Sequence, residues 1–228
     1  MLENHLIIFD LDGVIVDSEP IAARIEAEML REAGLTIDER EVLKRFLGRS
    51  EDQMRRSVEI ELGRPLHEDF TAELRSRVLA AFENELLPIP GIAAVLRRLT
   101  GPRCVASSSA LERIRTSLKI ADLFSQFSPH LFSASMVERG KPAPDLFRYA
   151  ASQMGIPIAR CIVIEDSTAG VRAGKAANMT VFGFVGGSHL IADQDGDRLR
   201  EAGADVVFDR MSDLPRLLAA RVADVTSA

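Results

Sequence analysis

From residue 88 onward, short apolar runs alternate with segments of helical periodicity, and this alternation constrains the fold more than any other feature. The apolar runs cover residues 103–106, 130–134, 161–164, 181–185 and 205–208. The helical patterns cover approximately 91–99, 110–119, 144–155, 168–178, 189–202 and 212–222. Strands that alternate with helices form βαβ units, whose strands are parallel and whose helices cover the sheet. We therefore expect an α/β fold with a doubly wound, Rossmann-like parallel sheet.

One further apolar run, LIIF at residues 6–9, is separated from the others by a block that reads as all-helical, from about 18 to 87. Ser18 is expected to cap the first helix of this block, and Ser50 with Gln53 matches the capping-box pattern S-x-x-Q of another. Residues 70–86 carry an apolar residue at every fourth position, which indicates a third long helix. The simplest arrangement places residues 1–16 and 88–228 in one α/β core domain and residues 17–87 in an inserted α-helical cap domain.

Charge and hydropathy narrow the range of partners. The formal net charge is −6 and no basic tract occurs, so nucleic acid and anionic membranes are poor partners. No run approaches the ~20 apolar residues of a membrane span, and LIIF is too short for a signal peptide. The two cysteines, Cys104 and Cys161, each open an apolar run and are expected to be buried thiols in a reducing compartment. We expect a cytoplasmic protein and, since no coiled-coil heptad is present, a monomer.

Polar side chains follow four of the apolar runs at the point where each run ends. In open α/β sheets, ligands bind at the carboxyl ends of the strands. The residues found there are Asp10, Leu11, Asp12 and Gly13 after the first run, Ser107, Ser108 and Ser109 after the second, Lys141 beyond the third, and Glu165 with Asp166 after the fourth. Carboxylates, hydroxyls and an ammonium group would thus converge on one edge of the sheet.

This set of side chains suits phosphoryl transfer. Oxygen ligands such as Asp10 and Asp166 favour a hard cation, Mg²⁺ rather than zinc, and that cation would offset the repulsion between the acids. Ser107 can donate a hydrogen bond to a phosphoryl group, and Lys141 adds a positive charge. Backbone N–H groups of the DLDG turn would bind the same oxygens. An aspartate can also act as the nucleophile and become an aspartyl phosphate.

Four blocks of this chain, DLDGVIVDS, VASSS, RGKPAPD and VIEDS, occur in the order found in the haloacid dehalogenase superfamily. The chain resembles the capped phosphosugar phosphatases and β-phosphoglucomutase-like members of that superfamily, over almost its whole length. The closest likeness is to bacterial sugar-phosphate and phosphogluconate phosphatases. The helical insertion would then be the α-helical cap of the family.

The resemblance implies a role for each site residue. Asp10 would attack phosphorus, and Asp12 would protonate the leaving alcohol and later activate water. Ser107 and Lys141 would hold the transferring group, with the backbone of Leu11 and the side chain of Ser108 as further substrate contacts. Mg²⁺ would be bound by Asp10, the carbonyl oxygen of Asp12, Asp166 and Glu165, the last directly or through water.

Two expectations concern the substrate side of this site. For Asp12 to be half protonated near pH 7, its pKa must rise by ~3 units from its usual ~3.9, which a closed and dry site would favour. Arg49, in FLGRS of the cap, is expected to reach a carboxylate or phosphate of the substrate. A phosphorylated sugar acid would supply a carboxylate for this arginine to bind.

Each candidate also has a structural interpretation. Asp10 and Asp12 suit the start of a turn, one of the three serines is expected to cap the next helix, and Lys141 suits an exposed loop. Asp17 is expected near a hinge, in a structural role.

The class of reaction has alternatives. A phosphosugar mutase resembling β-phosphoglucomutase stays open, although Glu51, Ala22 and the pair Ala110-Leu111 stand where that enzyme has an arginine, a histidine and Lys-Asn. A non-catalytic binding protein of the same fold is a second alternative. Receiver domains carry similar acidic residues, but they are about half this length and lack a cap. The preferred prediction is an Mg²⁺-dependent phosphatase that hydrolyses a small phosphorylated sugar or sugar acid.

Overall fold

The computed structural model describes residues 4–226, whose strands form one six-stranded parallel sheet in the order β3-β2-β1-β4-β5-β6. The strands are β1 (Leu6–Phe9), β2 (Arg103–Ser107), β3 (Leu131–Ser133), β4 (Cys161–Glu165), β5 (Thr180–Phe184) and β6 (Val206–Phe208). β1 lies between β2 and β4, with Ile8 in register with Cys104 on one side and Val163 on the other. The expected doubly wound parallel sheet is confirmed.

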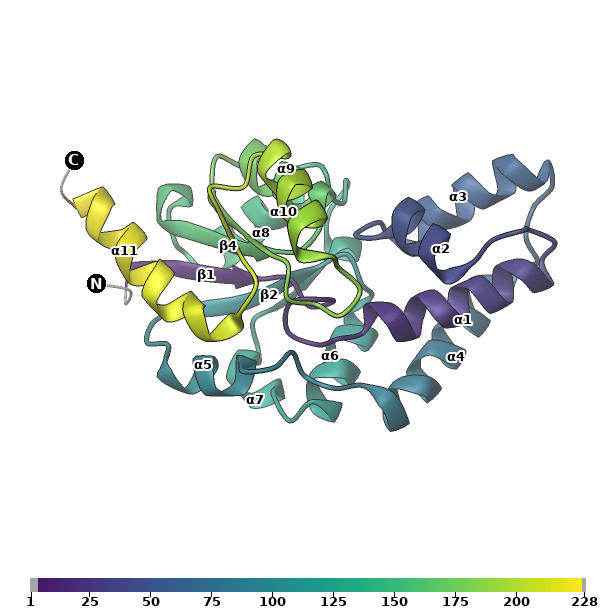
Figure 1. The fold of residues 1–228 in the computed structure, drawn as a ribbon, viewed down its shortest axis with the longest axis horizontal. Coiled ribbons are helices and arrows are strands. Elements are labelled where there is room, and N and C mark those ends of the chain that lie inside the picture. The colour runs from purple at the N-terminus through teal and green to yellow at the C-terminus, as the bar shows by residue number, and fades with distance from the viewer. Residues whose placement is uncertain (1–3, 227–228) are drawn as a thin grey trace.

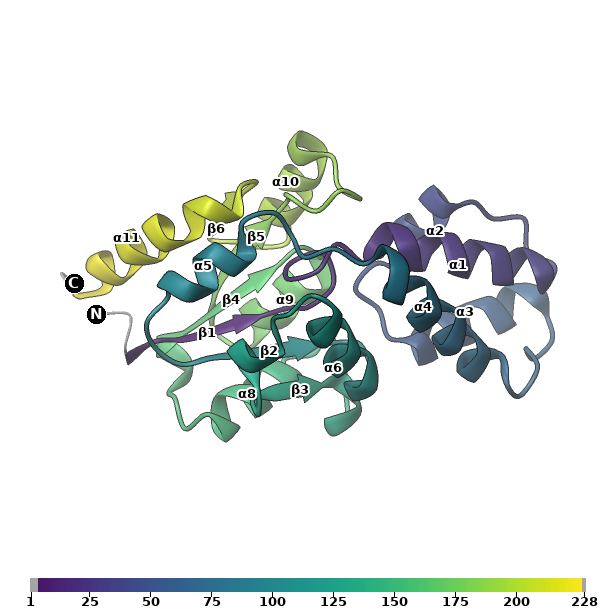
Figure 2. The same cartoon turned by 90° about the horizontal axis from the view of Figure 1, so that it is seen from below.

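Helices cover both faces of this sheet, because successive side chains of each strand point to opposite sides. Ile7 and Phe9 pack in a core shared with α5 (Ile92–Arg98), α6 (Leu111–Ile120), α7 (Phe124–Phe127) and α11 (Leu214–Thr226). Leu6 and Ile8 pack in a second core with α8 (Asp145–Gln153), α9 (Thr168–Ala176) and α10 (Ala192–Glu201). Figures 1 and 2 show the sheet between these two groups of helices.

Four helices occupy the block between β1 and α5, and no described residue from 17 to 87 lies in a strand. They are α1 (Glu19–Glu32), α2 (Glu39–Phe46), α3 (Glu51–Leu62) and α4 (Phe70–Glu85). The four form a separate group at one end of the molecule, opposite both chain ends (Figure 1). The domain bounds 1–16 with 88–228 and 17–87 stay a prediction; residues 1–3 and 227–228 lie outside the described part of the chain.

Local signals explain where the helices of this group begin and end. Ser50 and Gln53 form the expected capping box at the start of α3, since the Ser50 N–H donates to Gln53 Oε1 and the Gln53 N–H donates to Ser50 Oγ. Gly63 ends α3 with a φ of 65°, a conformation that favours glycine. Over residues 4–226, every helix is too short or too polar to cross a lipid bilayer.

Candidate active site

Three buried carboxylates meet where β1 and β4 end. Oxygen atoms of Asp10, Glu165 and Asp166 all lie within 4.8 Å of one another. β1 and β4 are hydrogen-bonded neighbours, so the residues that follow them share one edge of the sheet. Gly13 makes room for this cluster: its φ is +74°, and a Cβ atom there would lie 1.8 Å from Asp166 Oδ2. The predicted convergence of these three acids is present in the structure.

The electrostatics of the three acids fit a hard cation. Burial raises the pKa of Asp10 well above its usual value; Lys141 opposes this rise, and the neighbouring carboxylates add to it. Burial and Glu165 likewise raise the pKa of Asp166. Asp10 Oδ1 and Asp166 Oδ2 are buried, and each faces a basic side chain, Lys141 Nζ at 2.9 Å and His189 Nε2 at 3.2 Å. A buried set of carboxylate oxygens is the kind of site that a divalent cation such as Mg²⁺ stabilises.

Lys141 is buried between two of these acids rather than exposed in a loop. Its Nζ lies 2.9 Å from Asp10 Oδ1 and 2.5 Å from Glu165 Oε1, and its side chain is 1% exposed. Burial lowers the pKa of Lys141, but Asp10 and Glu165 outweigh that effect and raise it above its usual value. Lys141 is therefore a permanent cation directly beside Asp10.

Glu165 holds this arrangement together. Its Oε2 accepts hydrogen bonds from the backbone N–H groups of Asp166 and Ser167 and from the hydroxyl of Ser167. Ser167 in turn accepts a hydrogen bond from the Gly170 N–H and caps α9, as expected for this position. Both oxygens of Glu165 are thus already engaged, one by Lys141 and one by the turn after β4.

The carboxylate of Asp12 accepts hydrogen bonds on both oxygens. Oδ1 accepts from Ser18 Oγ at 2.6 Å and from Arg113 Nη2 at 2.7 Å. Oδ2 accepts from Ser109 Oγ at 2.7 Å and from Ser107 Oγ at 3.4 Å. The side chain of Asp12 is therefore fixed by groups from three separate segments.

The raised pKa that half protonation of Asp12 near pH 7 requires is not found. Burial raises this pKa, but the Arg113 charge and the hydrogen bonds from Ser109, Ser18 and Arg113 outweigh burial, so the pKa is lowered. Ser18 occupies the N-cap position of α1, as expected, but its hydroxyl makes no capping bond and donates to Asp12 instead.

None of the three serines after β2 caps the next helix either, because the N-cap position of α6 is Ala110. The hydroxyls of Ser107 and Ser109 point to Asp12, and that of Ser108 donates to the carbonyl oxygen of Gly48, 3.1 Å away in the loop between α2 and α3. Gly48 packs so closely on the core that a Cβ atom there would lie 2.6 Å from Ser167 Oγ. This serine block joins the sheet edge to the helical group.

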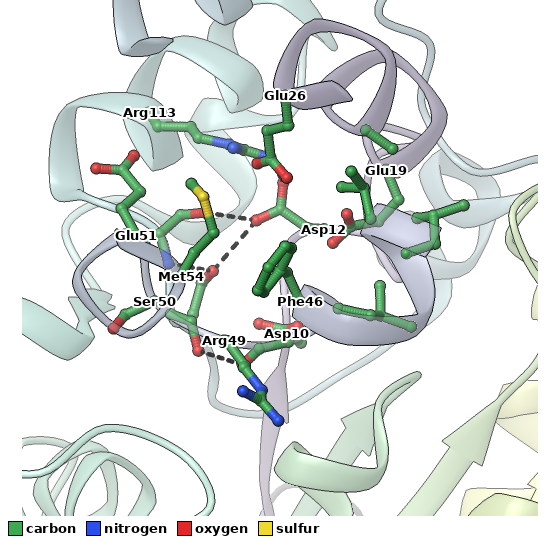
Figure 3. Close-up of a pocket in the computed structure, with 18 residues that line it drawn as sticks. Asp10, Asp12, Glu19, Glu26, Phe46, Arg49, Ser50, Glu51, Met54 and Arg113 are labelled. Carbon is green, nitrogen blue, oxygen red and sulfur yellow. Dashed lines mark hydrogen bonds and ion pairs between the residues drawn. The ribbon is translucent and has the colours of Figure 1, made fainter. Parts of the chain in front are cut away.

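A pocket of about 650 Å³, including its open mouth, lies between the sheet edge and the helical group. Asp10, Asp12, Ser107 and Ser108 line its floor, and Arg49 also lines it. Arg49 is exposed, and Figure 3 shows its guanidinium pointing away from Asp12 and Arg113. Arg49 thus belongs to the pocket, as predicted, but the structure gives it no partner among the described residues.

Other residues of the site were not predicted. Arg113 lies in the first turn of α6. Its signal in the sequence is that it closely follows the serine block at the end of a strand. Glu19 and Glu26 of α1 line the pocket. His189 follows β5, and its buried Nε2 lies 3.2 Å from Asp166 Oδ2. Asp17 accepts a hydrogen bond from the Ser188 N–H, in agreement with a structural role.

Comparison with known proteins agrees with this geometry. A family model of the haloacid dehalogenase-like hydrolases matches residues 5–178. The chain is 33% identical over 228 residues to 6-phosphogluconate phosphatase of Escherichia coli (strain K12), with 100% of both chains covered. It is 34% identical over 203 residues to hexitol phosphatase A of the same strain, covering 85% of this chain and 86% of that protein.

A solved structure shows the same architecture over nearly the whole chain. It is a haloacid dehalogenase-like protein of unknown function from Agrobacterium tumefaciens str. C58, which is 40% identical to this chain. The TM-score is 0.81, with 96% of this chain and 99% of that chain covered.

Proposed function

This chain belongs to the haloacid dehalogenase-like hydrolases, and from that premise we propose that it is an Mg²⁺-dependent phosphatase acting through an aspartyl phosphate on Asp10. The substrate is a small phosphorylated sugar or sugar acid, a class in keeping with the 6-phosphogluconate and hexitol phosphatases that the chain resembles. The observation that carries the proposal is the position of Asp10, whose carboxylate lines the pocket while Lys141 and two further acids surround it.

Asp10, Asp166 and the carbonyl oxygen of Asp12 would hold Mg²⁺, which when bound offsets the repulsion of the acids and the charge of the phosphoryl oxygens. Glu165 supports this site by fixing Lys141 and the turn that carries Asp166. Lys141 neutralises charge beside the transferring group, and Ser107 and the backbone of Leu11 bind its oxygens. Ser108, which is hydrogen-bonded to the Gly48 carbonyl oxygen, and the adjacent Arg49 contact the remainder of the substrate.

In the first step, an oxygen of Asp10 forms a bond to phosphorus while the ester P–O bond breaks and the leaving alcohol takes a proton. In the second step, water attacks phosphorus, the aspartyl P–O bond breaks and a base takes the proton of the water. Asp12 is the acid in the first step and the base in the second. Because Arg113 and three hydroxyls stabilise its carboxylate, Asp12 is poised as the base, and donating a proton requires Asp12 to separate from Arg113.

The predicted partners and location complete the proposal. The pocket serves a small-molecule phosphate ester, and the protein is a cytoplasmic monomer that binds neither nucleic acid nor membranes. The net charge of −6 supports the exclusion of polyanionic partners.

Phosphate release with Mg²⁺ tests the proposal over a panel of sugar phosphates and phosphorylated sugar acids, each assayed again with a chelator and with Asp10→Asn. We expect turnover that both controls abolish and that returns when Mg²⁺ is restored to the wild-type protein. Isomerised sugar phosphate without free phosphate would replace the proposal with the mutase. A protein that binds these esters but turns over none would replace it with a non-catalytic binding protein.

A further inference from the structure

One face of α1 presents two acids to the pocket. Glu19, Ala23 and Glu26 are spaced four and three residues apart, so they share one side of the helix, and all three line the pocket. Figure 3 shows Glu26 above Asp12 and Glu19 to the right of it, with Asp10 below all three.

These two acids differ from the other acids of the pocket in having no basic partner. Among the described residues, Asp10 pairs with Lys141, Asp12 with Arg113, and Glu51 with Arg75 at 2.6 Å. The side chains of Glu19 and Glu26 make neither a hydrogen bond nor an ion pair with any residue from 4 to 226. A bound molecule can therefore satisfy both of these side chains.

Of the two cations of the pocket, one is already paired and the other lies at its exposed side. The two basic residues that line it are Arg49 and Arg113. Arg113 is held by Asp12, and its side chain stacks over Phe82 with the guanidinium carbon 5.1 Å from the ring centre. Arg49 lies at the exposed side and points away from Glu26 (Figure 3). The interior beyond the phosphate position is therefore acidic.

The pKa values of Glu26 and Glu19 suit these side chains to binding hydroxyl groups of a substrate. Burial raises the pKa of Glu26 to about 7 and that of Glu19 to about 8, with Asp12 adding to both shifts and Arg113 opposing them. A carboxyl group that exchanges its proton near neutral pH can both donate to and accept from a hydroxyl. A carboxylate of the substrate would face the same groups as a like charge.

We propose, building on the phosphatase function above, that Glu26 and Glu19 bind hydroxyl groups of a neutral polyhydroxylated phosphate ester and select against phosphorylated sugar acids. The site would thus favour polyol or neutral sugar phosphates. Glu26 and Glu19 are specificity-determining residues in this account, and Asp10 is the residue that attacks phosphorus.

A matched substrate pair tests this selection. Glucitol 6-phosphate and 6-phosphogluconate differ only at C1, which is an alcohol in the first and a carboxylate in the second. We expect kcat/KM at pH 8 to favour glucitol 6-phosphate by about tenfold or more, the scale of one partly screened like-charge contact. Glu26→Gln keeps the size and hydrogen bonding of the side chain but removes its charge. The ratio of the two kcat/KM values should therefore fall by about fivefold.

The controls separate this inference from the proposed function. Glu28→Gln, on the same helix but outside the pocket, should leave the wild-type preference unchanged. Glu19→Gln provides a second variant in case Glu26→Gln folds poorly. Phosphate release from p-nitrophenyl phosphate, which has no hydroxyl groups, reports on the phosphatase alone. If that ester is hydrolysed but 6-phosphogluconate is preferred, or if Glu26→Gln and Glu19→Gln alter both sugar substrates equally, the selection is refuted while the phosphatase stands. If no ester is hydrolysed, the proposed function itself fails.

Discussion

Arg113 Nη2 donates a 2.7 Å hydrogen bond to Asp12 Oδ1, which joins the first turn of α6 to the turn after β1. Both side chains are largely buried, at 14% and 9% exposure. Removing the arginine would leave a buried carboxylate without its cation. We expect Arg113→Met to lower the free energy of unfolding at pH 7 by about 3 kcal/mol.

The effect of this substitution depends on pH. The pKa of Asp12 is lowered in the folded protein, so the stability it contributes is present above its usual pKa and is lost as the pH falls through the folded value. Urea denaturation from pH 7 down to pH 3 should show the cost of Arg113→Met shrinking. Arg115→Met, an exposed position on the same helix, is the control. A cost that is independent of pH would mean that Arg113 stabilises the protein by packing on Phe82 and not through Asp12.

Glu26 should have the opposite pH dependence. Its pKa is raised from 4.5 to about 7, so the folded state keeps a proton that the unfolded state has lost between these values. The stability of the wild type therefore falls as the pH rises from about 4.5 to about 7 and is unaffected by this group above that range. Glu26→Gln removes the penalty and should stabilise the protein by about 2 kcal/mol at pH 8.

Denaturation of Glu26→Gln and wild type at pH 4 and pH 8 checks this prediction. The two proteins should have nearly equal stability at pH 4, and Glu28→Gln should show no such pH-dependent difference. The groups that face Glu26 are Arg113 of α6, Glu51 of α3 and Asp12 after β1, and these residues stay the same in both variants. A wild type that is more stable than Glu26→Gln at pH 8 would contradict the raised pKa.

Metal binding should stabilise the fold. Asp10, Glu165 and Asp166 repel one another, and a cation offsets this repulsion only in the folded state. Mg²⁺ at a hundred times its dissociation constant should add about 2.7 kcal/mol and raise Tm by about 5–10 °C.

Asp166→Asn should abolish most of this rise in Tm, whereas Asp197→Asn, an exposed acid on α10, should leave it intact. Differential scanning calorimetry with and without chelator measures the change. A similar rise with Asp166→Asn would place the metal elsewhere.

The sheet and its acidic edge were predictable from local pattern. Every predicted strand lies within about two residues of the observed one, because a strand buried on both faces reads as an apolar run. Asp10, Glu165 and Asp166 follow from the same signal, since neighbouring parallel strands end at one edge whatever packs around them. The order of the motifs in the sequence predicts that Lys141 lies at this edge. The sequence does not indicate that its side chain is buried between two acids.

The environment of Asp12 was not predictable, because it depends on contacts far apart in the chain. Ser109 and Arg113 lie 97 and 101 residues from Asp12, and the packing of α6 brings them together. Glu19 and Glu26 look like ordinary exposed acids of α1, since helical spacing does not say which polar positions face a pocket. His189 follows β5, so the rule that polar residues gather at the carboxyl ends of parallel strands covers this residue too.

The most direct test of the account is to find the phosphoryl group on Asp10. In Asp12→Asn the base for the second step is gone, so a substrate with a good leaving group, p-nitrophenyl phosphate, should phosphorylate Asp10 and leave it phosphorylated in the presence of Mg²⁺. Acid quenching and peptide mass mapping should then show one added phosphoryl group on Asp10. Release of phosphate by the wild type, with no phosphoryl group on Asp10 in Asp12→Asn or with the group on another residue, would contradict the central claim.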